Sequence, residues 1–150
     1  MEFSVLMSIY YKENPIFFNR AMQSVFDDQT LKPSEIVLVQ DGLLTQELCA
    51  LIKKWQHRLG DVFKIIELEK NLGLGVALNI GLASCRHDLV ARMDTDDIAH
   101  PDRFKIQIEY MIEELDCDIL GSSVTEFDDN PDFVISSRVV PLTHDDIVLY

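Results

Sequence analysis

The clearest pattern in this chain is the stretch Leu89-Val-Ala-Arg-Met-Asp-Thr-Asp-Asp-Ile-Ala-His-Pro-Asp-Arg103, where an apolar run leads into a cluster of acids. The apolar run predicts a short buried strand. Because side chains alternate along a strand, we expect Asp94 and Asp96 to project together while Thr95 points away. Pro101 suits the first turn of a helix. The stretch therefore predicts a strand, an acidic corner and a helix.

Two carboxylates on the same side of a strand end repel each other unless a positive charge lies between them. Hard divalent cations such as Mg²⁺ and Mn²⁺ prefer oxygen ligands, and they commonly take one or two carboxylates together with substrate phosphates. The alternative is a solvated acidic cap on the following helix. That alternative accounts for acids near the helix N-terminus but not for a further acid at the strand end, so we favour a metal-binding corner.

The length and composition of the chain are those of one globular domain, and its net charge is strongly negative. The chain has 150 residues, of which 47% are hydrophobic and 26% charged, and its formal net charge is −13. This charge disfavours nucleic acid or an anionic membrane as the main partner of the segment. The cysteines are odd in number and widely spaced, so we expect reduced core residues of a cytosolic protein at Cys49, Cys85 and Cys117.

The rest of the chain alternates short apolar runs with segments of helical periodicity. We expect strands at 3–9, 35–39, 62–68 and 89–93, helices at 15–28, 45–59, 76–85 and 101–115, two further strands within 119–125 and 133–140, and a helix starting at Thr143. This alternation predicts an α/β fold, with a doubly wound, mostly parallel sheet that carries helices on both faces.

Polar residues stand at the exit of each of the first four predicted strands: Ser8 and Tyr10, then Asp41, then Asn71, then Asp94 and Asp96. Strand exits share one edge of a parallel sheet, and ligands bind there. For Asp41 two interpretations stay open, an ordinary turn with Gly42 or a carboxylate that accepts hydrogen bonds from a uracil or a ribose. Tyr10 is either a stacking platform for a base or a half-buried loop aromatic.

Other candidate residues carry weaker signals. The stretch Lys70-Asn-Leu-Gly-Leu-Gly75 lacks the spacing of a Walker loop and reads either as a phosphate-binding turn or as a plain helix entry. Arg92 and Arg103 flank the acids as ion-pair partners or phosphate contacts, and for Arg103 we favour a structural role. The histidines show no metal-ligand spacing, and for His100 we favour a surface position.

Taken together, these motifs resemble those of family 2 glycosyltransferases of the GT-A fold, and the resemblance is closest to bacterial enzymes that build exopolysaccharide, capsule or O-antigen. The matching segments occur in the family's order over nearly the whole chain. They are Ser4-Val-Leu-Met-Ser-Ile-Tyr10, Gln29-Thr30, Pro33, Glu35-Ile-Val-Leu-Val-Gln-Asp-Gly42, Asn71-Leu-Gly-Leu74, Ala77-Leu-Asn79, Arg92-Met-Asp-Thr-Asp-Asp97 and Pro101-Asp-Arg103.

The resemblance implies a role for each candidate residue. Ser8 and Tyr10 would contact the nucleotide base, Asp41 would bind uracil or ribose, Asn71 would line the donor pocket, and Asp94 and Asp96 would hold Mn²⁺ or Mg²⁺ on the donor diphosphate with Asp97 beside them. We favour Asp96 for the metal. The chain departs from the family at Tyr11, where Asn is common, and at Gln40, where an acid is common, so the base preference stays open.

The function implied is inverting, metal-dependent transfer of a sugar from a nucleoside-diphosphate donor, with a UDP-sugar favoured, to a saccharide or lipid-linked acceptor in surface-polysaccharide synthesis. Residues 1–150 would form the N-terminal, donor-binding part of the GT-A domain. The catalytic base and acceptor site are expected after Tyr150, so we expect this part alone to be inactive. A full-length enzyme of this kind is expected in the cytoplasm, at the inner face of the membrane.

Two other classes of protein also place acids beside an α/β sheet. A nucleotidyltransferase would normally carry a glycine-rich and basic first loop, which Tyr10-Tyr-Lys-Glu13 is not. A non-enzymatic regulatory domain of the receiver type would place paired acids after the first strand, where this chain has Ser8-Ile-Tyr10. Both alternatives fit the sequence less well than a glycosyltransferase.

Overall fold

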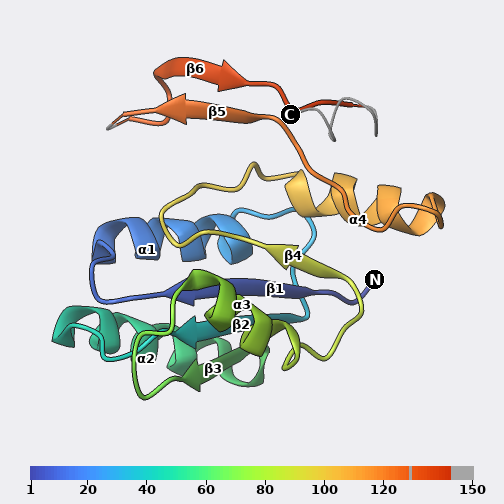
Figure 1. Cartoon of the computed structure of the whole chain (residues 1–150). Helices are drawn as coiled ribbons and strands as arrows, with labels where there is room; N and C mark the ends of the chain where they lie inside the picture. The colour runs from blue at the N-terminus through green and yellow to red at the C-terminus, as the bar shows by residue number, and fades with distance from the viewer. Residues whose placement is uncertain (129, 143–150) are drawn as a thin grey trace. The chain divides into compact units, whose positions relative to one another are not determined.

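The computed structural model describes residues 1–128 and 130–142 (Figure 1). The chain divides into two compact units, Met1–Tyr110 and Met111–Tyr150, and the division falls inside helix α4 (Arg103–Glu113). The first unit contains a parallel sheet with helices, and the described part of the second contains an antiparallel pair of strands.

The first unit is built on a four-stranded sheet of β1 Ser4–Ile9, β2 Glu35–Gln40, β3 Phe63–Glu67 and β4 Val90–Arg92. The strands lie in the order β3-β2-β1-β4, and every neighbouring pair is parallel. The connecting segments are α1 Pro15–Met22 with a π-helical turn η1 Gln23–Asp27, α2 Gln46–Leu59 with a 3₁₀ turn η2 Gly60–Val62, and α3 Leu74–Leu82. This arrangement confirms the predicted doubly wound α/β fold.

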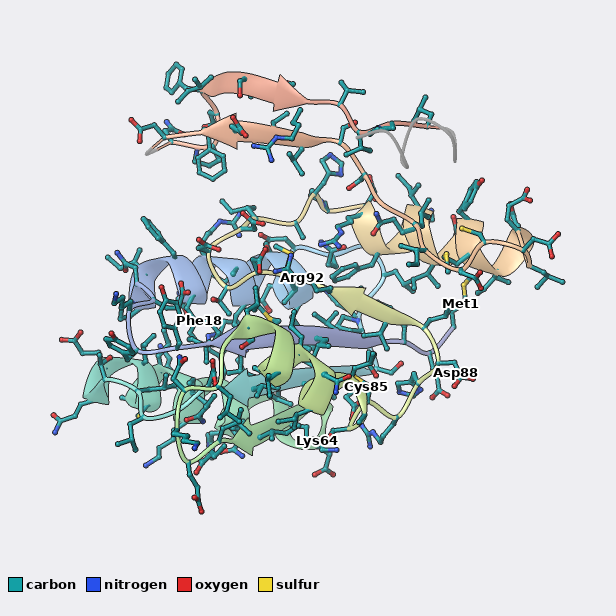
Figure 2. The ribbon with its side chains drawn as sticks, in the orientation of Figure 1. Met1, Phe18, Lys64, Cys85, Asp88 and Arg92 are labelled. Atoms are coloured by element: carbon teal, nitrogen blue, oxygen red, sulfur yellow. The ribbon has the colours of Figure 1, made fainter. Side chains whose placement is uncertain are left out.

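The two faces of the sheet bury different residues. Phe3, Val5, Met7 and Ile9 form one core with apolar residues of α1, α2 and α4, and Phe18 of α1 is fully buried within it (Figure 2). On the opposite face, a smaller cluster joins Leu6, Val37, Val39 and Ala77 of α3. Helices therefore cover both faces, and strand β1 is apolar on both sides, as a central parallel strand requires.

Local sequence signals set the beginnings of two helices. Asn14 caps α1 because its side chain accepts a hydrogen bond from the main-chain N–H of Ile16 at 2.8 Å, with Pro15 in the first turn. Thr45 caps α2, and its hydroxyl accepts from the N–H of Leu48 at 3.3 Å. Both helices therefore begin where the sequence predicts.

The described part of the second unit contains β5 Val124–Phe127 and β6 Val134–Arg138, which pair antiparallel in a sheet of their own. The prediction that the first of these strands begins at Ile119 is wrong. The pairing starts at Val124 because the partner strand extends only as far as the residue opposite it, Arg138. The helix predicted to begin at Thr143 lies outside the described residues.

One expectation that came from composition, on the cysteines, is met in part. The three cysteines are free, as predicted, but each is only partly buried, so they are not core residues. Burial raises the pKa of the Cys85 thiol, and the nearby charge of Glu35 raises it further. Within the part of the chain that the structure describes, we find no helix that combines the length and the apolar character needed to cross a bilayer.

Glu35, at the start of β2, is a buried carboxylate whose partners lie in three segments. Its side chain is 1% exposed, accepts from the Ser4 hydroxyl at 2.6 Å and from the main-chain N–H of Arg86 at 2.8 Å, and pairs with the Arg86 guanidinium at 2.9 Å. Burial by itself raises the pKa of Glu35, but the hydrogen bonds from Ser4 and Arg86 and the positive charges outweigh it, so the net pKa is lowered. The ionised carboxylate therefore joins β1, β2 and the segment before β4.

We predict that Glu35→Ala lowers the free energy of unfolding at pH 7 by about 2–4 kcal/mol, because buried partners lose their acceptor. A lowered pKa in the folded state stabilises the fold above the unfolded-state pKa of about 4.3, and this contribution is lost as pH falls through the folded-state pKa. Urea denaturation of both proteins at pH 7 and at steps from about pH 5 to 3 measures the difference, which should shrink in acid.

The matched control is Glu69→Ala, which removes an exposed glutamate and should change the stability by less than about 0.5 kcal/mol. A loss in Glu35→Ala that is the same at every pH would show that the ionised state of Glu35 contributes nothing.

Candidate functional site

A cleft of about 490 Å³ opens at the carboxyl ends of the strands of the first unit. It is lined by Ser8, Tyr10, Glu13, Asp41, Asn71, Gly73, Leu74, Arg92, Asp94, Thr95 and Asp96. Six of the seven residues predicted from the sequence lie among them, and the seventh, Asp97, follows directly in the chain. The exits of β1, β2 and β4 and the loop before α3 therefore converge on one site.

The cleft lies where the order of the strands reverses. The chain runs outward from β1 to β2 and β3, then returns to the other side of β1 to form β4. β1 and β4 are thus neighbours on either side of this reversal, and in open α/β sheets a crevice forms at the carboxyl ends of the strands at such a point. Arg92 is the last residue of β4 and marks this end of the sheet (Figure 2).

The β1 exit contributes a tight turn to one wall of the cleft. The N–H of Glu13 donates to the carbonyl oxygen of Tyr10 at 3.1 Å, which closes the turn before α1. The Tyr10 ring is 37% exposed and packs edge-on against Tyr11, with 5.8 Å between ring centroids. The carbonyl of Ser8 accepts from the Thr95 hydroxyl at 3.4 Å. Tyr10 is thus half exposed at the cleft, and either of its predicted roles is sterically open.

Glu13 is a cleft residue that the sequence analysis missed. Partial burial raises the pKa of its carboxyl, and the charges of Asp96 and Asp94 raise it further, while a hydrogen bond with Thr95 opposes the shift. The loop that carries Glu13 has no motif spacing. Its position one residue before the Asn14 cap, close to the end of a central strand, was the signal available in the sequence.

Asp41, at the exit of β2, holds the loop that precedes α3. Its two carboxylate oxygens accept from the main-chain N–H groups of Leu72 and Gly73, at 2.7 and 2.9 Å. The side-chain amide of Asn71 donates back to the Asp41 carbonyl at 3.3 Å. Asp41 is only 3% exposed, so its principal contacts are with the loop. We call this set of contacts the Asp41 clasp, and a direct contact with uracil or ribose stays a prediction.

The acidic corner after β4 has an internal structure of its own. Thr95 is buried, whereas Asp96 and Asp97 are exposed and Asp94 is half-buried. Asp94 and Asp96 both line the cleft, but Thr95 lines it too, and β4 already ends at Arg92, so the predicted alternation along a strand does not extend to these residues. Arg92 forms an ion pair with Asp94. Among the described residues, the Asp96 carboxylate has no side-chain hydrogen bond and no ion pair, so it is free to take a ligand.

Asp97 faces the same charge cluster. Partial burial raises the pKa of its carboxyl, and the charges of Asp94 and Asp96 raise it further. The guanidinium groups of Arg92 and Arg103 oppose the shift. Glu13 and Asp97 thus both lie close to the charges of Asp94 and Asp96. A positive charge brought close to these acids would relieve the repulsion between them.

Arg103 has the structural role that we favoured. Its guanidinium donates to the carbonyl of Arg92 at 2.9 Å and to the sulfur of Met93 at 3.0 Å, and its Nε donates to Gln107 at 3.1 Å. It therefore ties α4 to the end of β4. His100 is exposed, as expected.

The donor set at the corner fits a hard divalent cation in part. Carboxylate oxygens from Asp94, Asp96 and Glu13 line one cleft. Among the residues that the structure describes, no three His, Cys, Asp or Glu side chains are close enough together to hold a metal ion by themselves. One or two carboxylates completed by phosphate oxygens and water is the usual arrangement for Mg²⁺, and these residues suit that arrangement.

Comparison with known proteins gives one family over almost the whole chain. Residues 4–146 match the model of glycosyl transferase family 2. The chain is 45% identical over 130 residues to the UDP-Gal:alpha-D-GlcNAc-diphosphoundecaprenol beta-1,3-galactosyltransferase of Escherichia coli. The matched stretch covers 87% of this chain and 46% of that protein. It is 46% identical over 145 residues to the amylovoran biosynthesis glycosyltransferase AmsE of Erwinia amylovora, covering 97% and 53%. The chain thus spans about half the length of these curated relatives.

Solved structures share the fold. S. aureus TarS 1-349 in complex with UDP-GlcNAc matches with a TM-score of 0.65 and 25% identity, over 77% of this chain and 32% of that chain. A mannosyltransferase from Pyrobaculum calidifontis matches with a TM-score of 0.62 and 19% identity, over 82% and 34%, which bears on the fold alone. These likenesses confirm the predicted GT-A fold with its Rossmann-like sheet.

We predict that Gly42→Ala disrupts the Asp41 clasp. Gly42 has a φ of +87°, and an added Cβ would lie 2.6 Å from the main-chain nitrogen of Asn71. The left-handed backbone alone costs about 1 kcal/mol for alanine, and the steric clash adds to it. Urea denaturation should therefore show a loss of stability of at least about 1 kcal/mol.

Gly75→Ala is the matched control, because it lies within α3 and an added Cβ there meets nothing within 4 Å. Alanine is the better helix former, so this variant should keep or raise the stability. If both variants were equally stable, the close approach at Gly42 would have no energetic weight.

Proposed function

The chain belongs to glycosyl transferase family 2, and from that premise we propose that its cleft binds the nucleotide part of a nucleoside-diphosphate sugar. We favour a UDP-sugar, because the E. coli relative is named for UDP-Gal and TarS was solved with UDP-GlcNAc. The proposed reaction transfers the sugar to a saccharide or lipid-linked acceptor in the synthesis of a bacterial surface polysaccharide. The names of the two curated relatives support this assignment.

The observation that carries the proposal is that two acids and a nucleotide-sized cleft meet at the switch point of the sheet. Asp94 and Asp96 line the same cleft as Tyr10 and the Asp41 clasp. Its volume of about 490 Å³ lies in the range of roughly 300–1,000 Å³ that is usual for small-molecule sites. In open α/β sheets this position is where nucleotides bind.

Each wall of the cleft offers a different kind of contact to the donor. The half-exposed ring of Tyr10 can stack on the base, with Ser8 beside it. The Asp41 clasp presents the loop at Asn71, which we propose lines the donor pocket. The guanidinium of Arg92 also lines the cleft and can contact phosphate oxygens.

The charge of the protein requires a positive group near the donor. With a net charge of −13 and several acids in the cleft, a diphosphate would be repelled by the bare site. We propose that Asp96, with Asp94 and Asp97 beside it, holds Mn²⁺ or Mg²⁺. Such an ion neutralises the charge that develops on a departing diphosphate.

The proposed transfer inverts the anomeric carbon, with the acceptor hydroxyl losing its proton to a carboxylate. We assign no base within residues 1–150, and a base beyond Tyr150 in a longer protein stays a prediction. A lipid-linked acceptor, as in the name of the E. coli relative, would place the enzyme at the inner face of the membrane. Donor binding is therefore the step that can be measured directly on this chain.

We predict that Mn²⁺ strengthens the binding of UDP to this chain by at least about tenfold, which is about 1.4 kcal/mol. In Asp96→Asn the enhancement should fall below about threefold, because a neutral amide is a weaker ligand for a hard cation. Isothermal titration calorimetry with UDP, with and without Mn²⁺, measures both values.

Asp88→Asn is the control, since Asp88 is an exposed acid before β4, at the end of that strand remote from the cleft (Figure 2). It should leave the Mn²⁺ enhancement unchanged. Enhancement that persists in Asp96→Asn would remove Asp96 from the proposed metal site, and the absence of UDP binding would count against the donor site as a whole.

A further inference from the structure

Gln29 does not line the cleft, but its side chain makes a set of hydrogen bonds that reach the loop after β4. It follows the π-helical turn at the end of α1, and its side chain is 3% exposed. Its amide nitrogen donates to the carbonyl of Ser24 at 2.7 Å and to the carbonyl of His100 at 2.9 Å. Its amide oxygen accepts from the N–H of Phe104 at 3.3 Å. A single side chain thus joins the end of α1 to the loop between β4 and α4.

The neighbours of Gln29 reach the same loop. Ser24 is fully buried, and its hydroxyl accepts from the N–H of Ala99 at 3.0 Å. The N–H of Thr30 donates to the carbonyl of Pro101 at 2.9 Å, and its hydroxyl donates to Asp102 at 2.9 Å. Ser24, Gln29 and Thr30 therefore fix the main chain from residue 99 to residue 104, and we call these three residues the loop anchor.

The other end of the loop is fixed separately. The N–H of Met93 donates to the carbonyl of Leu6 at 3.0 Å, and Thr95 reaches the Ser8 carbonyl. Between Thr95 and Ala99 only residues 96–98 lack such an attachment, and they include the two exposed acids Asp96 and Asp97. The acids therefore stand on a three-residue span with a fixed point on each side.

We propose that Gln29 is a positioning residue for the donor site: it sets the position of Asp96 and Asp97 by holding the main chain that follows them. The inference rests on the proposed function, because the acids need a fixed position only if they bind the metal and the diphosphate. Gln29 does not line the cleft, so it acts through the loop and not through contact with the donor.

An amide is well suited to this position. The loop presents a carbonyl at His100 and the first turn of α4 presents an N–H at Phe104, and glutamine is able to donate to the first and accept from the second. An apolar side chain would leave the buried N–H of Phe104 without its acceptor, and the carbonyl of His100 would keep only its bond from the N–H of Arg103 at 2.9 Å. The loss of these bonds favours local opening of the loop. Ligand geometry for small divalent ions is demanding, so a loosened span should bind metal less well.

Hydrogen exchange and calorimetry on Gln29→Leu test the inference. Amides of residues 96–104 should exchange at least about tenfold faster than in the unchanged chain, while those of β1 and β2 keep their relative protection. The affinity for UDP without metal should stay within about twofold, whereas the enhancement by Mn²⁺ should fall from at least about tenfold to less than about threefold. Ser24→Ala, which removes a single contact of the loop anchor, should show the same pattern to a smaller degree and serves if Gln29→Leu does not fold.

Glu35→Ala is the control for general loss of stability, since Glu35 begins β2 at the end opposite the cleft. It should speed exchange throughout the first unit and leave the Mn²⁺ enhancement intact. Exchange of residues 96–104 that is unchanged in Gln29→Leu, or an enhancement that survives it, would overturn the inference. If the unchanged chain binds UDP with no response to Mn²⁺, the metal proposal fails, and exchange alone then decides whether Gln29 holds the loop.

Discussion

Repulsion among carboxylates at one edge of the sheet is the constraint around which the first unit is arranged. Glu13, Asp94 and Asp96 line one cleft, and Asp97 adjoins it. Partial burial raises the pKa of the Glu13 and Asp97 carboxyls, and the neighbouring charges of Asp94 and Asp96 raise both further. A fold tolerates such a cluster only if other contacts hold it in place, and clusters of this kind often mark functional sites.

The contacts that hold the cluster are mainly hydrogen bonds between side chains and the main chain. On one side, the Asp41 clasp ties the loop before α3 to the exit of β2. On the other, the loop anchor and Thr95 tie the loop after β4 to α1 and β1. Arg92 and Arg103 add positive charge without filling the cleft. Hydrogen bonds thus hold the chain on both sides of the acids, while Asp96 and Asp97 themselves stay exposed.

The sequence was sufficient to predict the parallel sheet, because strands apolar on both faces alternate with capped helices at 14–15 and 45. The acids after β4 were predictable because they follow one another in the sequence, directly after a recognisable strand. The separate pairing of β5 with β6 was not, since their exposed side chains carry no core pattern. Glu13 was missed because its place beside Asp96 depends on how two distant loops meet.

The same limit applies to Gln29, which belongs to a recognisable motif but whose partner His100 lies 71 positions away. No periodicity or spacing predicts that pairing, because it depends on the path of the loop after β4. The role of Asp41 shows the limit in another form. Its turn with Gly42 was visible in the sequence, whereas the loop amides it holds come from a segment 31 and 32 positions further on.

The separate attachment of the two walls has an evolutionary consequence. The Asp41 side of the cleft is fastened to β2, and the acidic side is fastened to α1 and β1, so neither set of contacts runs through the other. Changes in distant, unshared contacts tend to combine additively. Descendants of this chain could therefore acquire a different loop at Asn71, beside the Asp41 clasp, without rebuilding the wall that carries Asp94 and Asp96.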